Sequence, residues 1–184
     1  MKRMEHLNNS QRGRNVEKDL VLANENARRL AAARGFDEVF ELVKRSAEDS
    51  LGLHRAGLTL VLGDLTNGIG AYHEMGSNSI VMNRNIMKIV WHSTRSRAKR
   101  NSYVFMILLH EYLHSLGFTE EPQVRSLSKR ISDKFLGKGH VVGEMATRPL
   151  DEFFPLLPQY AAFRDKREYE TIRRFDSSST PYIG

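Results

Sequence analysis

The sequence predicts a single α+β domain. Segments with apolar residues three and four positions apart, the spacing of one helix face, lie at 16–51 and again at 103–136. Between them, in 57–83, apolar residues alternate with small or polar ones, which is typical of strands. The 184 residues are enough for one sizeable core, and no repeat or composition shift marks a second domain. We expect the domain to span 16–175.

The first third of the chain is expected to supply packing elements. Residues 1–15 are polar and basic and predict a flexible arm. One helix should run from Val16 to Ala33, before Gly35, and a second over 37–51 with its apolar residues on one side. Neither helix carries residues that suggest chemistry.

The middle of the chain predicts a strand followed by a hairpin. Leucines alternate with small or polar residues in 57–65, as expected for a strand. Two short apolar pieces, 69–73 and 79–83, are separated by Glu-Met-Gly-Ser-Asn, a turn composition. A short helix is expected at 85–91, and the basic stretch 93–101 is expected to form a loop.

The clearest chemical pattern lies in the segment 103–121. His110 and His114 are four residues apart, so on a helix they point to the same side and can hold one metal ion through ring nitrogens. Glu111 would lean over the open side of the ion, where a carboxylate can take a proton from a bound water. The flanking residues are apolar, and buried polar groups need a partner such as a metal ion.

Capping and helix-ending residues around this segment predict where the helix begins and ends and where the next helix begins. Ser102 is expected to cap its N-terminus, and Gly117 to end it. A further helix should begin near Glu120–Pro122 and end at Gly137, since apolar residues form one stripe along it. The charged segment 160–174 is expected to be helical, and 176–184 to form a polar C-terminal tail.

The hairpin candidate and the His110-Glu111-x-x-His114 helix together resemble the zincin metallopeptidases. The resemblance covers about 57–145 and is specific over 110–117. It implies a zincin-like α+β domain with a small mixed sheet, an edge hairpin, and an active-site helix followed by a glutamate-bearing helix. It also implies one Zn²⁺ per chain and a peptidase that uses a metal-bound water activated by Glu111. An unpaired strand edge within 69–83 would suit an extended peptide.

The third metal ligand distinguishes the branches of the zincins. Metzincins have a histidine where this chain has Glu120, whereas gluzincins take a glutamate from the next helix. Glu121 resembles the gluzincin arrangement, in a short form like that of the single-domain minigluzincins. If the two helices form a hairpin about Phe118, residue 121 returns level with His114. Glu121 is therefore expected as the ligand ahead of Glu120, with His140 third.

The sequence leaves the substrate-binding residues open. Hydrolysis of a peptide needs a donor for the tetrahedral oxyanion besides the metal. Five residues could supply it, and the sequence does not choose among Tyr72, His73, Tyr103, His140 and Arg148. The tail after Phe175 could fold over the cleft, and a disordered terminus is the simpler alternative.

Composition limits the remaining possibilities. The chain has no cysteine, which excludes disulfides and thiolate ligands and leaves nitrogen and oxygen to hold a metal. The net charge of +6 suggests nucleic acid as an alternative partner. The chain would then be either a nucleic-acid-binding protein whose zinc is structural or a DNA-associated zincin protease. The basic stretch lacks aromatic residues for stacking on bases, which favours a peptide or protein substrate. Lacking a long apolar run or signal-like start, the chain is expected in the cytoplasm without a membrane partner.

Overall fold

The computed structural model describes the chain except for residues 1, 67, 159–168 and 177–184. The described residues form six α-helices, one 3-10 helix and a four-stranded mixed sheet, so the predicted α+β class is confirmed. The elements in chain order are α1 Lys2–Ala32, α2 Phe36–Leu51, β1 Thr59–Gly63, β2 Ala71–His73, β3 Ser79–Asn83, α3 Arg84–Ser93, α4 Arg97–Ser115, α5 Glu121–Leu136, α6 Val141–Met145, the 3-10 helix Leu150–Glu152 and β4 Glu170–Ile172.

The sheet has the strand order β2-β3-β1-β4. β1 and β3 are parallel, while β2 pairs antiparallel with β3 and β4 pairs antiparallel with β1. The predicted hairpin is therefore confirmed, and its strand β2 is an edge of the sheet. The helix predicted over 160–174 is wrong where the structure describes it, because 170–172 form a strand that pairs with the exposed edge of β1. Residues 160–168 of that segment lie outside the described residues.

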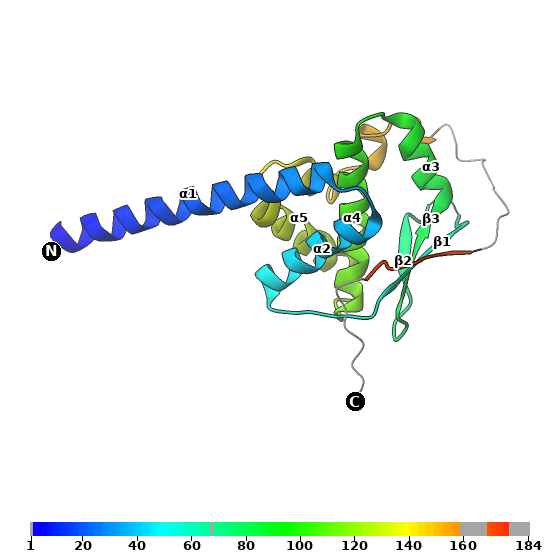
Figure 1. Cartoon of the computed structure of the whole chain (residues 1–184), viewed down its shortest axis with the longest axis horizontal. Coiled ribbons are helices and arrows are strands. Elements are labelled where there is room, and N and C mark those ends of the chain that lie inside the picture. Colours follow the sequence, from blue (N-terminus) through cyan, green and yellow to red (C-terminus); the bar gives the residue numbers. More distant parts are fainter. Residues whose placement is uncertain (1, 67, 159–168, 177–184) are drawn as a thin grey trace.

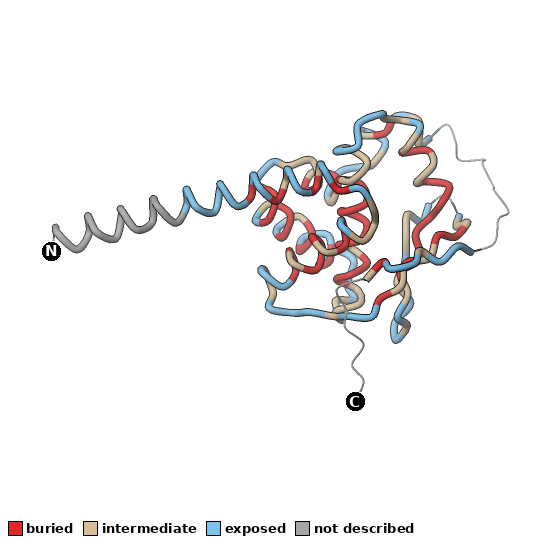
Figure 2. Tube along the Cα trace, in the orientation of Figure 1, coloured by how far each residue is buried: buried red, intermediate tan, exposed pale blue. Residues whose placement is uncertain are grey.

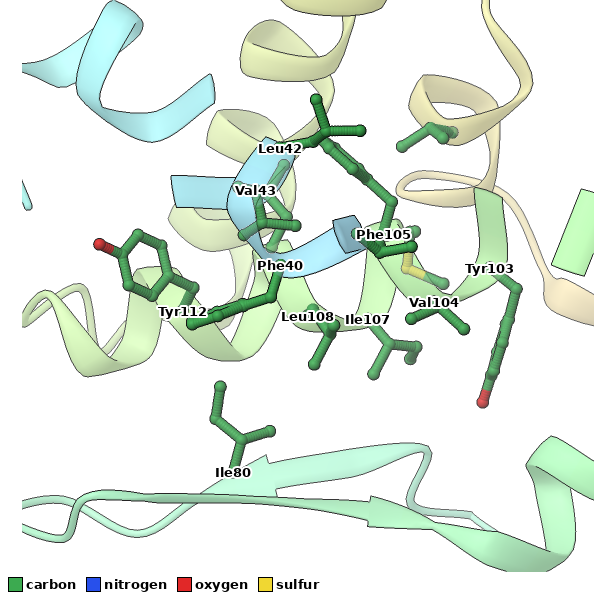
Figure 3. Packing of buried hydrophobic residues seen from close by; sticks show 14 of the residues in the cluster. Phe40, Leu42, Val43, Ile80, Tyr103, Val104, Phe105, Ile107, Leu108 and Tyr112 are labelled. Carbon is green, nitrogen blue, oxygen red and sulfur yellow. The ribbon is translucent and has the colours of Figure 1, made fainter. Parts of the chain in front are cut away.

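Helix α4 is the centre of the core and packs against α1, α2, α5, α6 and the sheet (Figure 1). From Ser102 to Leu113 its residues are buried, except for His110. Figure 3 shows Phe40 and Val43 of α2 and Ile80 of β3 among the residues that pack around it. A helix that is apolar on nearly all sides is expected to be surrounded by other elements of the core. The side of α4 that carries His110 is the side that reaches the surface.

Helix α1 begins at Lys2, within the segment predicted to be a flexible arm. No proline interrupts 2–32, so nothing in the sequence forces a break before Val16. Its C-terminal turns pack on the domain, where Leu30 is buried and the Asn26 amide donates to the Phe135 carbonyl at 3.1 Å. Toward its N-terminus the helix extends away from the body (Figure 1), and its residues 16–22 are exposed (Figure 2).

Helix α4 begins earlier than its sequence pattern predicts. Ser96 is the N-cap, and its hydroxyl accepts a hydrogen bond from the Lys99 backbone N–H at 3.3 Å. The prediction that Ser102 caps the helix is wrong. Its hydroxyl donates to the Ala98 carbonyl at 2.8 Å, as serine does within a helix. The loop predicted over 93–101 is correspondingly shorter, because this earlier serine provides a competent cap.

The C-terminal residues that the structure describes complete the core. The Phe175 ring stacks on Phe40 with a centroid distance of 4.2 Å. The Asp176 carboxylate pairs with Lys44 and accepts hydrogen bonds from the backbone N–H groups of Gly57 at 2.8 Å and Leu58 at 3.2 Å. Asp176 therefore belongs to the folded domain, and the rest of the predicted tail, 177–184, lies outside the described residues. Across the described chain, every helix is too short or too polar to cross a bilayer.

Candidate metal centre

The turn between α4 and α5 places a glutamate beside the two histidines. Gly117 has φ of +99°, a left-handed conformation that ends α4 as predicted. The N–H of Gly117 donates to the His114 carbonyl and that of Phe118 to the Leu113 carbonyl, the pair of bonds that defines a Schellman motif. Helix α5 starts at Glu121, so the chain reverses within a few residues and its first turn returns to the end of α4.

Three potential ligand groups converge there: His110, His114 and Glu121. The two Nε2 atoms lie 3.2 Å apart. Glu121 Oε2 lies 3.3 Å from His110 Nε2, and Glu121 Oε1 lies 3.1 Å from His114 Nε2. Ligands about 2.0–2.1 Å from a tetrahedral zinc are about 3.3 Å from one another. The three groups therefore lie close enough together to hold one metal ion.

The second nitrogen of one histidine is fixed by the turn itself. His114 Nδ1 lies 2.8 Å from the Phe118 carbonyl oxygen, which can only accept, so Nδ1 carries the proton. In the neutral ring Nε2 then has a free lone pair, directed at His110 and Glu121. Histidine ligands are commonly oriented by a hydrogen bond of this kind on their other nitrogen.

The pKa values of two of these groups shift toward the forms that bind metals. Burial lowers the pKa of His110, which favours the neutral ring. Partial burial alone would raise the pKa of Glu121, but the charges and hydrogen bonds of His110 and His114 outweigh it and lower that pKa. Neutral imidazole and ionised carboxylate are the ligand forms of these side chains.

Glu111 lies at the same opening but points to the sheet side. Only 5% of its surface is exposed, and its carboxylate accepts a hydrogen bond from the backbone N–H of His73 in the edge strand β2. Burial, followed by the charge of Glu121, raises the pKa of Glu111 to about 7, against the effect of that hydrogen bond. A carboxyl group with a pKa near neutrality can both accept and return a proton.

These residues share a cleft of about 820 Å³. Its lining includes the edge strand β2 with the residues before it, and the segment Met145–Leu150. Gly70 accepts a hydrogen bond from the Asn83 N–H, so in the alternating pattern of an antiparallel pair Tyr72 bonds to β3. The backbone groups of Ala71 therefore face the open edge of the sheet, beside the cleft.

The remaining predicted residues divide into two groups. Tyr72, His73 and Arg148 line the cleft, whereas Tyr103 is fully buried in the core. Two candidate ligands lie elsewhere. Glu120 is an exposed residue at the N-cap of α5, and His140 caps α6 by accepting from the Val142 N–H at 3.3 Å. Of the three third-ligand candidates, Glu121 alone joins the two histidines among the described residues.

Arg55, which the sequence does not single out, joins the hairpin turn to the end of α4. Its guanidinium donates to the Ser115 carbonyl at the end of α4 (2.8 Å), and to the Ser77 carbonyl (2.7 Å) and Asn78 amide oxygen (2.9 Å) in the hairpin turn. The Tyr112 hydroxyl also bonds to both backbone groups of residue 55. Arg55 lies in a loop and its partners are scattered along the chain, so no spacing signals it.

Replacing Arg55 with alanine should loosen the hairpin from α4. Three hydrogen bonds from a charged group are lost, so we expect a free energy of unfolding lower by about 2–3 kcal/mol. We also expect faster amide exchange in 71–79, measured by hydrogen-exchange mass spectrometry. Arg55→Lys keeps the positive charge but lacks the several N–H donors of the guanidinium, so it should restore only part of the protection of 71–79 from exchange. Unchanged exchange in 71–79 would contradict this bridging role.

Comparison of the chain with protein-family models, curated proteins and solved structures finds no match. The resemblance to zincins therefore stays a prediction, and the chemistry of the cleft has to carry any functional conclusion.

Proposed function

We propose that this protein is a zinc-dependent metallopeptidase with a zincin-like domain. The observation that carries the proposal is the convergence of His110, His114 and Glu121 at a cleft in which the buried Glu111 carboxylate lies next to the edge strand β2. Three nitrogen and oxygen ligands leave a fourth position open, as in catalytic rather than structural zinc sites. Two imidazole nitrogens and one carboxylate oxygen suit zinc. No thiolate is needed, and the chain has no cysteine to supply one.

Each residue has a distinct part in the proposed reaction. His110, His114 and Glu121 would hold the ion, which supplies Lewis-acid polarisation of the scissile carbonyl and makes water a better nucleophile. Glu111 takes the proton from the attacking water and later returns it to the leaving amine. Its raised pKa suits both transfers. The backbone groups of Ala71 would pair with the substrate as an added strand.

The basic stretch 93–101, which includes the first turn of α4, supports nucleic-acid binding less than the cleft supports a peptidase. The Arg100 guanidinium donates to the Thr94 carbonyl at 2.7 Å and the Trp91 carbonyl at 3.0 Å. The Lys99 ammonium lies over the Phe154 ring, 5.2 Å from its centroid. Part of this charge therefore holds α3 and the segment after α6 against α4. Peptide or protein thus remains the proposed substrate class.

Metal content is the direct test of the proposal. We expect one zinc per chain, measured by plasma emission spectroscopy, and more than tenfold weaker zinc binding in Glu121→Ala, measured by competition with a chromogenic chelator. Glu120→Ala is the matched control because it removes a neighbouring exposed carboxylate that does not line the cleft. Equal zinc affinity in the two variants would exclude Glu121 as a ligand. Folded protein that takes up no zinc would overturn the proposed function.

A further inference from the structure

Apart from the catalytic groups, the charged side chains that line the cleft are basic. Among the described residues, the carboxylates in its lining are Glu111 and Glu121, which the proposed mechanism uses. Burial, with the nearby charge of Arg55, lowers the pKa of His73 and so favours its neutral form. The other charged residues in the described lining are Arg125 and Arg148.

The two arginines differ in how far their charge is already offset. The Arg148 guanidinium binds Glu152, with its Nε 3.0 Å from the carboxylate, and lies 3.8 Å from Glu144. Arg125 is 66% exposed, and its carboxylate partner among the described residues is Glu121, at 3.8 Å. A bound metal ion would be coordinated by that same Glu121 carboxylate and would weaken its attraction for Arg125. The Arg125 guanidinium would then face the cleft with its donors available to another anion.

The position of Arg125 places such an anion close to the reacting bond. Arg125 follows Glu121 by one helical turn on α5, so both side chains lie on the same face of the helix. Its Nε is 3.8 Å from the Glu121 oxygen that lies 3.3 Å from His110 Nε2. Successive residues of an extended peptide are about 3.3 Å apart, so the guanidinium can reach a group one or two residues from the scissile bond.

We propose that Arg125 forms a carboxylate-binding subsite in this cleft, so that the preferred substrates are peptides with a carboxylate next to the cleaved bond. The proposal rests on the proposed function. A guanidinium binds a carboxylate through two parallel hydrogen bonds, which lysine cannot reproduce. An acidic side chain and a C-terminal carboxylate present the same chemistry. A lysine or arginine at that peptide position would be repelled.

Peptide binding tests the subsite without requiring turnover. The zinc-loaded Glu111→Gln protein is titrated, by fluorescence anisotropy, into labelled peptides that differ only in Glu, Gln or Lys at each position. Each peptide is made with a free and an amidated C-terminus. We expect the preferred carboxylate to tighten binding about tenfold over its neutral analogue, as for a charged hydrogen bond. If amidation of the C-terminus removes the tighter binding, the terminal carboxylate is its source. If the tighter binding persists, an acidic side chain is its source.

Charge-reversal variants on α5 distinguish a local effect of Arg125 from the effect of the overall charge of the protein. Adding Arg125→Glu should abolish or invert the preference, whereas Arg130→Glu should leave it intact. Arg130 is exposed on the same helix, does not line the cleft, and its reversal changes the net charge equally. Equal binding of Glu, Gln and Lys peptides, or the same effect from both variants, would overturn the subsite.

Hydrolysis by the unmutated, zinc-loaded chain distinguishes the two proposals. If the chain cleaves peptides with no preference for a carboxylate, the subsite is wrong and the peptidase stands. If Arg125 confers the binding preference but no peptide is cleaved, the proposed function is wrong and the subsite stands.

Discussion

Glu111→Gln should abolish peptide hydrolysis while the protein keeps its zinc. The amide retains the shape of the carboxyl group and can still accept from the His73 N–H, but it cannot take a proton from water. General acid and base groups contribute about 10²- to 10⁴-fold, and this residue would serve as both, so kcat/KM should fall by at least about 10³-fold. Steady-state hydrolysis of a quenched fluorescent peptide, paired with zinc analysis, measures both quantities.

Glu120→Gln is the matched control for this prediction. It makes the same chemical change at an exposed residue outside the cleft and should leave kcat/KM within about twofold. If Glu111→Gln hydrolyses peptide at the parent rate with zinc bound, Glu111 is not the base. If it loses zinc, the residue supports the metal site instead.

Asp176→Ala should cause the largest loss of stability. The side chains of Lys44 and Asp176 are only 2% and 3% exposed, and the carboxylate also accepts from two backbone N–H groups. Burial acts to lower the pKa of Lys44, but Asp176 and Glu41 outweigh it and raise that pKa, so the lysine is charged. Breaking a buried ion pair costs about 3–5 kcal/mol, and the remaining Glu41 carboxylate favours the lower end. Urea unfolding measures the difference.

An exposed pair provides the comparison for Asp176→Ala. Glu25 and Arg29 form an ion pair on α1 with about half of each side chain exposed, so Arg29→Ala should cost less than about 1 kcal/mol. Similar losses in the two variants would mean that the Lys44–Asp176 pair contributes little beyond an ordinary surface contact.

Local patterns predicted most of the candidate site because its parts are close in sequence. Helix periodicity placed His110 and His114 on one face, and the short connection through Gly117 returned Glu121 to them. The hairpin followed from two apolar pieces around a turn. Each of these features is set by residues within a few positions of one another, which is the range over which periodicity and turn chemistry act.

The features that the sequence did not predict depend on distant partners. β4 forms because β1 offers it an open edge, and a charged segment carries no sign of such a partner. Arg55 bonds to residues of the hairpin and of α4 that are remote in the chain. Ser96 caps α4 in place of the predicted Ser102, because the helix begins within the basic stretch 93–101 that was expected to be a loop.

The order of synthesis has a consequence for this fold. β4 and Asp176 bind to β1 and to the residues just before it, over a separation of 119 residues for the bond to Gly57. A chain emerging from the ribosome therefore exposes the histidine helix and Glu121 before β4 can join the sheet and before the buried ion pair can form. Long-range pairing of this kind forms late and slowly. If the proposed function holds, every residue of the site is therefore made before residues 170–176 add the contacts of β4 and Asp176 that stabilise the domain.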